Sequence, residues 1–505
     1  MKNRIAVYVA ALLGIAFVFL MWYYPSQIPR PWFDEGWTLA TARNWVETGR
    51  YARLLNGTPI SATGMAWDFP VTAPVALSFR LFGFGIWQGR LPSALFTLAS
   101  VFFIFLLAKK MYGEKTALVS ITLIILGFPF SLLFGRQAIG EPAMIFYLLA
   151  GYYCFRGYLE KRSTLSLILS ILLWALALTS KNQTLPFWVA SMLAMIFFAS
   201  LKKDRFIFRA AASATFGTII LWQGMLKFQH ILEKDLPLYG APMKGLLEVT
   251  GWVPVWHLRL QALDLITIFA LPLLFGLGYA LFQEKSVWQI KNETEPVFYL
   301  RLAYWVFVAS WLFWFATSGM PWGRYLYPAV FLGNVFVAVL ILRLTDGLNF
   351  HQLISSISTM LFKRQFKLNG LTAIIGVVSL TYIALVIIWS FKYTVLNNDV
   401  EKIAEYLNQT TPENASIETY DSELLFLVDR RFHYPPDQIQ VELNKRKYLY
   451  PLTEIPYDPM LTEPDYIVVG PYGNMWELYK TTIDQEDLWE LIHETSDYKV
   501  YQRTP

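Results

Sequence analysis

Two adjacent carboxylates, Asp34 and Glu35, follow the first apolar stretch of the chain in the run Trp-Phe-Asp-Glu-Gly-Trp. A carboxylate can act as a general base toward a hydroxyl group, so this pair could support acid–base chemistry. Acidic residues are also common in solvated loops that follow a membrane segment. The pair alone does not separate these two interpretations.

Four further charged residues lie beside the ends of other apolar stretches: Arg136 and Glu141 bracket one short turn, Lys181 lies in a second, and Arg324 lies in a third. Arginine and lysine can hold a phosphate and stabilise the charge that develops as it leaves. Cations and carboxylates on one face would therefore suit transfer of a group from a lipid phosphate to a hydroxyl. Each residue also has a simpler interpretation, because the cations could anchor span ends and Glu141 could mark a helix start before Pro142.

Membrane-spanning helices must position these residues. Only 16% of the 505 residues are charged and 55% are hydrophobic, whereas soluble domains carry about 25% charged residues. The apolar runs are long enough to cross a bilayer core of about 30 Å. They predict about eleven spans, near residues 5–24, 90–108, 116–134, 142–157, 164–180, 184–201, 209–226, 262–282, 298–316, 325–343 and 370–391. The first run lacks a small-residue cleavage site, so we expect a span there and not a signal peptide.

Positive residues predict the orientation. With the N-terminus in the cytoplasm, alternate connecting segments hold most of the lysines and arginines, as the positive-inside rule requires. The short outer turns then hold one cation each, Arg136, Lys181 and Arg324. Residues 25–89 and 227–261 become aromatic-rich outer loops, and a short helix is predicted from Thr38 to Tyr51.

The tail, residues 392–505, differs from the transmembrane domain of residues 1–391. It holds 21 acidic and 10 basic residues and has no apolar run long enough to span a membrane. We expect a small extracytoplasmic α/β domain. Its pattern predicts helices at Val400–Gln409 and Leu488–His493 and strands at Ser416–Tyr420, Asp465–Gly470 and Tyr498–Gln502.

Five stretches, taken together, resemble motifs of the GT-C glycosyltransferases, in particular the bacterial protein-mannosyltransferase and aminoarabinose-transferase-like families. The stretches are Phe33-Asp34-Glu35, Gly89-Arg90-Leu91-Pro92-Ser93, the segment from Arg136 to Glu141, Lys181, and Arg324-Tyr325-Leu326-Tyr327-Pro328. The tail segments Glu418–Asp421 and Asp429–Pro436 are similar to the outer soluble domain of bacterial members. The resemblance covers nearly the whole chain.

This resemblance implies a sugar donor carried on a polyprenyl phosphate and an inverting transfer to an acceptor hydroxyl. We expect a lipid or a cell-surface glycan as the acceptor, although the sequence does not separate these from a protein. It implies Asp34 as the catalytic base, although the sequence does not separate it from Glu35. Lys181 and Arg324, with Arg136 as a weaker candidate, would hold the donor phosphate. Glu141 would support the site.

The chain departs from the aminoarabinose transferases late in the first outer loop. Their Glu-Lys-Pro-Pro run is replaced by a stretch from Trp67 to Pro74 in which Asp68 is the only acid. Asp68 is therefore an acceptor-side or supporting candidate, and aminoarabinose is in doubt as the sugar. His230 and His257 could offer nitrogen ligands to a divalent metal, but they lack close ligand spacing, so no cofactor is required by the sequence.

The expected protein is thus a polytopic α-helical membrane enzyme of the bacterial inner membrane, whose partners are membrane lipids, a lipid-linked sugar and an acceptor, and not a nucleic acid. Two other classes stay open. A lipid or sugar transporter commonly shows internal repeats and charges near the bilayer midplane, and neither is evident here. A non-catalytic assembly subunit would use the acidic tail to bind a partner.

Overall fold

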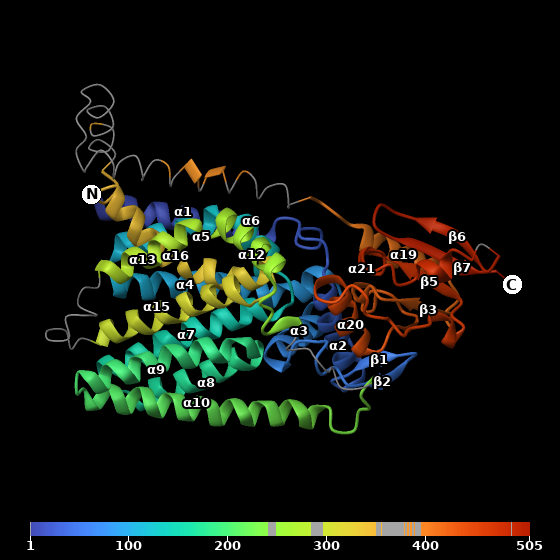
Figure 1. Cartoon of the computed structure of the whole chain (residues 1–505), viewed down its shortest axis with the longest axis horizontal. Coiled ribbons are helices and arrows are strands. Elements are labelled where there is room, and N and C mark those ends of the chain that lie inside the picture. Colours follow the sequence, from blue (N-terminus) through green and yellow to red (C-terminus); the bar gives the residue numbers. More distant parts are fainter. Residues whose placement is uncertain are drawn as a thin grey trace.

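The computed structural model describes residues 2–240, 249–283, 296–349, 395–485 and 487–504, together with isolated positions between 350 and 394. A long helical bundle forms one end of the molecule and a smaller domain with a sheet forms the other (Figure 1). The first outer loop lies between them. The predicted combination of a helical bundle with a small C-terminal α/β domain is therefore confirmed.

The bundle helices coincide with the first ten predicted spans. Two of those spans are each broken into two helices, one at Gly127 and the other at Ala270. At Ala270 the two helices bend by 79° relative to each other. The eleventh, near 370–391, lies largely outside the described residues. The helices are α1 (Lys2–Trp22), α4 (Ile86–Tyr112), α5 (Glu114–Leu126), α6 (Phe128–Gly135), α7 (Gly140–Lys161), α8 (Thr164–Ser180), α9 (Leu185–Leu201), α10 (Arg205–Leu232), α12 (Trp256–Phe269), α13 (Leu271–Gln283), α15 (Pro296–Thr317) and α16 (Gly323–Leu344).

Length and hydropathy single out a subset of these helices as able to cross a membrane. Within the described residues, four qualify: α4, the segment Asn182–Leu201, α15 and α16. Counting the bent α12–α13 pair as one span gives five. The total of eleven stays a prediction.

The first outer loop folds into α2 (Phe33–Thr48), a hairpin of β1 (Arg53–Leu55) and β2 (Thr58–Ile60), and α3 (Phe69–Phe82). The predicted start of the first helix at Thr38 is wrong, because α2 begins at Phe33. The Glu35 side chain accepts the Trp32 backbone N–H at 3.4 Å and so caps the first turn. The predicted end at Tyr51 is also wrong by three residues, because α2 ends at Thr48 and Gly49 follows it with φ +74°, a backbone conformation that favours glycine.

The tail domain is built on a five-stranded sheet in the order β4-β3-β5-β7-β6. Its strands are β3 (Ser416–Thr419), β4 (Arg431–His433), β5 (Tyr466–Val469), β6 (Trp489–Glu494) and β7 (Lys499–Arg503), and its main helices are α19 (Asp399–Thr410) and α20 (Asp437–Tyr448). The three predicted strands and the first predicted helix are confirmed. The predicted helix at Leu488–His493 is wrong: this segment is strand β6, because pairing with β7 overrides its local pattern.

The tail domain packs directly on α2. A Cβ added to Gly36 would lie 2.4 Å from the backbone nitrogen of Glu423, so only glycine permits this approach of the short helix η3 (Ser422–Leu424). The Ser422 hydroxyl donates to the Phe33 carbonyl at 2.5 Å. Phe33 and Trp37 from α2 belong to the same apolar core as the tail strands. The tail is therefore held against the segment that carries Asp34 and Glu35.

Candidate functional site

Glu35 is enclosed between α2 and α4 and has little remaining bonding capacity. Arg90 donates from Nε and Nη2 to the two Glu35 oxygens at 2.8 and 2.6 Å, and both side chains are fully buried. The Ala138 backbone N–H donates to the same carboxylate at 3.0 Å. Arg90 also donates to the carbonyls of Pro25 and Pro29. This pair therefore joins α2, α4, and the segments that follow α1 and α6.

Asp34 points elsewhere, although it precedes Glu35 directly. It forms an ion pair with Arg324 at the start of α16, and the Trp32 indole N–H donates to the same carboxylate at 3.1 Å. The Arg324 guanidinium also lies over the rings of Trp322 and Tyr325, at 5.0 and 5.2 Å. Both charged side chains keep partial exposure, 17% for Asp34 and 13% for Arg324. The structure thus brings together two predicted site residues that are 290 positions apart in the sequence.

Two cavities meet at this ion pair. We name the larger one, of about 950 Å³, the bundle-side cavity; its walls include Asp68, Lys181, Phe187, His230 and Phe313. The tail-side cavity, of about 640 Å³, is lined by residues that include Arg30, Trp32, Tyr448, Tyr472 and Asp497. Asp34, Trp322, Arg324, Gln440 and Asn444 line both. A group bound in either cavity could therefore reach Asp34.

Lys181 forms a second ion pair next to the bundle-side cavity. Its ammonium lies 2.6 Å from Glu141, and both side chains are buried. The rings of Trp67 and Tyr325 flank the ammonium at 5.0 and 4.8 Å. The second Glu141 oxygen has no hydrogen-bond partner among the described residues. Lys181 lines the cavity. Glu141 does not line it and contacts the Lys181 ammonium.

Asp68 brings a carboxyl group with altered acidity to the same cavity. Burial and the negative charge of Glu233 together raise the pKa of Asp68 to about 7. Glu233 accepts hydrogen bonds from the hydroxyl of Thr63 at 2.8 Å and from the Gln229 amide at 2.7 Å. The negative charge of Glu233 disfavours ionisation of Asp68.

The other predicted site residues lie apart from the Asp34–Arg324 pair. The Arg136 guanidinium is buried and donates to carbonyls at the end of α1, including that of Tyr23 at 2.7 Å. This geometry fits a helix cap better than a phosphate site. His230 lines the bundle-side cavity and His257 lies in the first turn of α12. Within the described residues, no group of three or more His, Cys, Asp and Glu side chains could hold a metal ion.

The tail contributes residues to the site that were not predicted from the sequence. Gln440 and Asn444 lie one turn apart on α20 and so face the same way, toward both cavities. Trp322 was missed on the bundle side. The i, i+4 spacing of two amides was visible in the sequence, but nothing there places α20 over Asp34.

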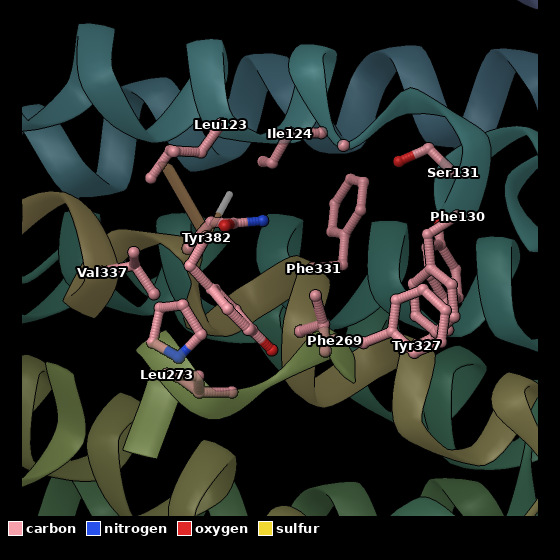
Figure 2. Close-up of a pocket in the computed structure, with 14 residues that line it drawn as sticks. Leu123, Ile124, Phe130, Ser131, Phe269, Leu273, Tyr327, Phe331, Val337 and Tyr382 are labelled. Carbon is pink, nitrogen blue, oxygen red and sulfur yellow. The ribbon is translucent and has the colours of Figure 1, made fainter. Parts of the chain in front are cut away.

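A separate apolar pocket of about 80 Å³ lies between helices of the bundle. Figure 2 shows the side chains of Phe130, Phe269, Tyr327 and Phe331 gathered around it, with Tyr382 reaching in from the segment before the tail. Its walls come mainly from α5, α6, α13 and α16. It is too small for a sugar and contains no charged residue, so the polar chemistry belongs to the two cavities at Asp34.

Comparisons with known proteins bear on the fold of the chain. Residues 71–222 match the family model of the dolichyl-phosphate-mannose-protein mannosyltransferases. ArnT from Cupriavidus metallidurans, in a crystal structure bound to undecaprenyl phosphate, has a TM-score of 0.64 at 14% identity, covering 99% of this chain and 98% of that one.

The Archaeoglobus fulgidus oligosaccharyltransferase tethered with an acceptor peptide has a TM-score of 0.57 at 10% identity, covering 100% of this chain and 74% of that one. No curated protein matches the chain. The chain therefore has the fold of the GT-C glycosyltransferase superfamily, and part of its bundle matches a mannosyltransferase family model.

Proposed function

We propose that this protein is a membrane glycosyltransferase that moves a sugar from a polyprenyl-phosphate donor to a hydroxyl-bearing acceptor, with inversion at the anomeric carbon. The observation that carries the proposal is the position of the Asp34–Arg324 pair at the junction of two cavities. A transfer between two substrates needs a base and a cation where both substrates can reach them. Similarity to ArnT with bound undecaprenyl phosphate supports a lipid-linked donor.

The bundle-side cavity suits the donor. Its cations, Lys181 and Arg324, can hold a phosphate, while Phe187, Phe313 and Trp314 provide apolar walls on α9 and α15. Phe313 is 67% exposed, so the apolar wall continues onto the outer surface of the bundle, where a polyprenyl chain could lie. Arg136 is left out of the phosphate site, because both terminal nitrogens of its guanidinium already donate to backbone carbonyls between Leu20 and Ile28.

Asp34 then acts as the general base. Its carboxylate accepts the proton of the acceptor hydroxyl while that oxygen attacks the anomeric carbon. The bond between the anomeric carbon and the phosphate oxygen breaks, and the polyprenyl phosphate leaves with the electron pair. Arg324 stabilises the charge that develops on the leaving phosphate, with Lys181 nearby. A single displacement of this kind inverts the configuration. Glu141 orients Lys181, and Asp68 lies close enough to the cavity to contact the sugar.

We place this site at the extracytoplasmic face of a bacterial inner membrane, with the N-terminus in the cytoplasm. A reporter fused after Asn398 should then be extracytoplasmic. A cytoplasmic signal would contradict the proposed orientation.

Mass spectrometry of envelope glycolipids and glycans from cells with and without the protein would test the activity. We expect one species to lose the mass of a single sugar when the protein is absent and to regain it on re-expression. Identical profiles in both strains would contradict the proposed transfer. The mass difference would also identify the class of the sugar.

A further inference from the structure

The tail-side cavity has the surface chemistry of a carbohydrate site. We propose that it binds the acceptor and that the bound part of the acceptor is an uncharged saccharide. This inference rests on the proposed function, since it assigns the second substrate of the same reaction. Its support comes from three features of the cavity: aromatic faces, balanced charge and amide side chains.

Aromatic rings from both domains line this cavity. Trp32 and Trp322 come from the membrane domain, and Tyr448, Tyr472 and Trp476 come from the tail. Trp32 meets Tyr472 edge-on at 5.2 Å, and Trp322 meets Tyr448 in the same way at 6.3 Å. In an edge-on pair, the ring that points its edge at the other has neither face covered by that neighbour. Phe33 stacks on Tyr472 at 4.6 Å and covers one face of that ring. The C–H face of a pyranose can pack on such a ring, so the rings suit a sugar better than a phosphate.

The charged residues of the cavity balance one another. Arg324 pairs with Asp34, and Arg30 lies 3.3 Å from Asp497 across the two domains. Among the described residues that line the cavity, these are the charged ones. A cavity with two cations and two carboxylates, each already paired, offers no net attraction to an anionic acceptor. An uncharged ligand fits this arrangement.

Amide side chains supply the polar contacts. Gln137, Asn397, Gln440 and Asn444 line the cavity, and each amide can both donate and accept a hydrogen bond. Sugar hydroxyls have the same dual capacity. Gln440 and Asn444 are also the amides that border Asp34 and Arg324, because they line both cavities. The tail domain therefore positions the acceptor hydroxyl next to the base, and α20 helps to determine which acceptor is used.

The bond changes follow from this placement. The saccharide hydroxyl in the tail-side cavity loses its proton to Asp34, and its oxygen forms the new glycosidic bond to the anomeric carbon of the donor. The anomeric carbon–oxygen bond to the phosphate breaks, and the polyprenyl phosphate departs as the anion into the bundle-side cavity. No oxidant or further reactant is needed.

Saturation-transfer NMR on the full-length protein in detergent, with undecaprenyl phosphate present, would test the inference. The probes are methyl glycosides of common hexoses and pentoses, with a capped serine tripeptide as the competing class. We expect saturation of ring protons for at least one glycoside and none for the tripeptide. Gln440→Ala should weaken glycoside binding by about fivefold, the effect of one lost hydrogen bond.

Gln438→Ala is the matched control. Gln438 lies on the same helix, but its amide donates a hydrogen bond to the Glu442 carboxylate at 2.6 Å and it lines neither cavity. This variant should bind glycosides like the natural protein. Tyr448→Ala is a second variant, which should weaken binding through loss of an aromatic face. Binding of the tripeptide alone, or equal glycoside binding by the Gln440→Ala and Gln438→Ala proteins, would overturn the inference.

Undecaprenyl phosphate binding is measured on the same samples, which separates this inference from the proposed function. If the lipid phosphate binds but no glycoside does, the acceptor assignment fails and the proposed donor site stands. If glycosides bind but the lipid phosphate does not, the proposed function fails, and with it the acceptor role of the cavity.

Discussion

Asp34 and Glu35 are neighbours in the first turn of α2, and each is paired with an arginine, yet their surroundings differ. The Glu35–Arg90 pair is fully buried, and backbone groups of the two segments that follow α1 and α6 match its charges. The Asp34–Arg324 pair keeps partial exposure and faces two cavities. The difference teaches that two adjacent carboxylates can have different roles: Glu35 joins segments within residues 1–391, and Asp34 stays accessible from both cavities.

Glu35→Gln should produce the largest effect, because it leaves the buried Arg90 cation without its partner. The loss in the free energy of unfolding should be about 3–5 kcal/mol, typical of a buried pair broken on one side. Thermal unfolding in detergent would measure it, with Asp34→Asn as the comparison. A Glu35→Gln protein as stable as the natural one would remove the contrast between the two pairs.

Arg324→Met should lower the rate of sugar transfer by roughly 10²–10³-fold, because it removes a cation that stabilises the leaving phosphate. Its melting temperature should change little. Arg43→Met is the control, since Arg43 also pairs with an aspartate, Asp429, outside the lining of both cavities. Equal transfer rates for the two variants would argue against a phosphate role for Arg324.

The Lys181–Glu141 pair combines features of the other two ion pairs. Lys181 is buried like Arg90, and it lines a cavity like Arg324. Lys181→Met should weaken undecaprenyl phosphate binding by about tenfold and should also lower stability, because Glu141 loses its cation. Adding Glu141→Gln should restore stability but not lipid affinity. Restored affinity in the double variant would show that Lys181 serves only the fold.

The smallest effect concerns pH. The folded-state pKa of Asp68 is raised to about 7, well above its unfolded value, so its contribution to stability is present at low pH and is lost as pH rises toward 7. The melting temperature should therefore fall by about a few degrees between pH 5 and pH 8. Asp68→Asn should reduce this dependence. An unchanged slope in the variant would contradict the assignment to Asp68.

Much of the fold follows from local patterns. Apolar length predicted helices at the first ten expected spans, and the order of the motifs predicted the GT-C fold, which the structural comparisons confirm. Strand β6 was missed, since its six residues become a strand only by pairing with β7. The start of α2 was missed because Trp32 is not a usual N-cap residue, and the Glu35 side chain supplies the cap.

The site was predictable only in part. Turn positions placed Asp34, Lys181 and Arg324 on one face, and the structure brings Asp34 and Arg324 into contact. The sequence could not separate Asp34 from Glu35, because neighbouring helical residues point in different directions only once the packing of α2 is known. Gln440 and Asn444 reach the site through tertiary packing alone, about 400 residues after Asp34.

The most direct test of the central claim is the rate of sugar transfer by purified Asp34→Asn protein, with Asp429→Asn as the matched control. The donor would carry the sugar identified from the envelope mass difference. We predict a rate at least about 100-fold below that of the control, from loss of the general base, with a nearly unchanged melting temperature. Transfer by Asp34→Asn at the control rate would contradict the account.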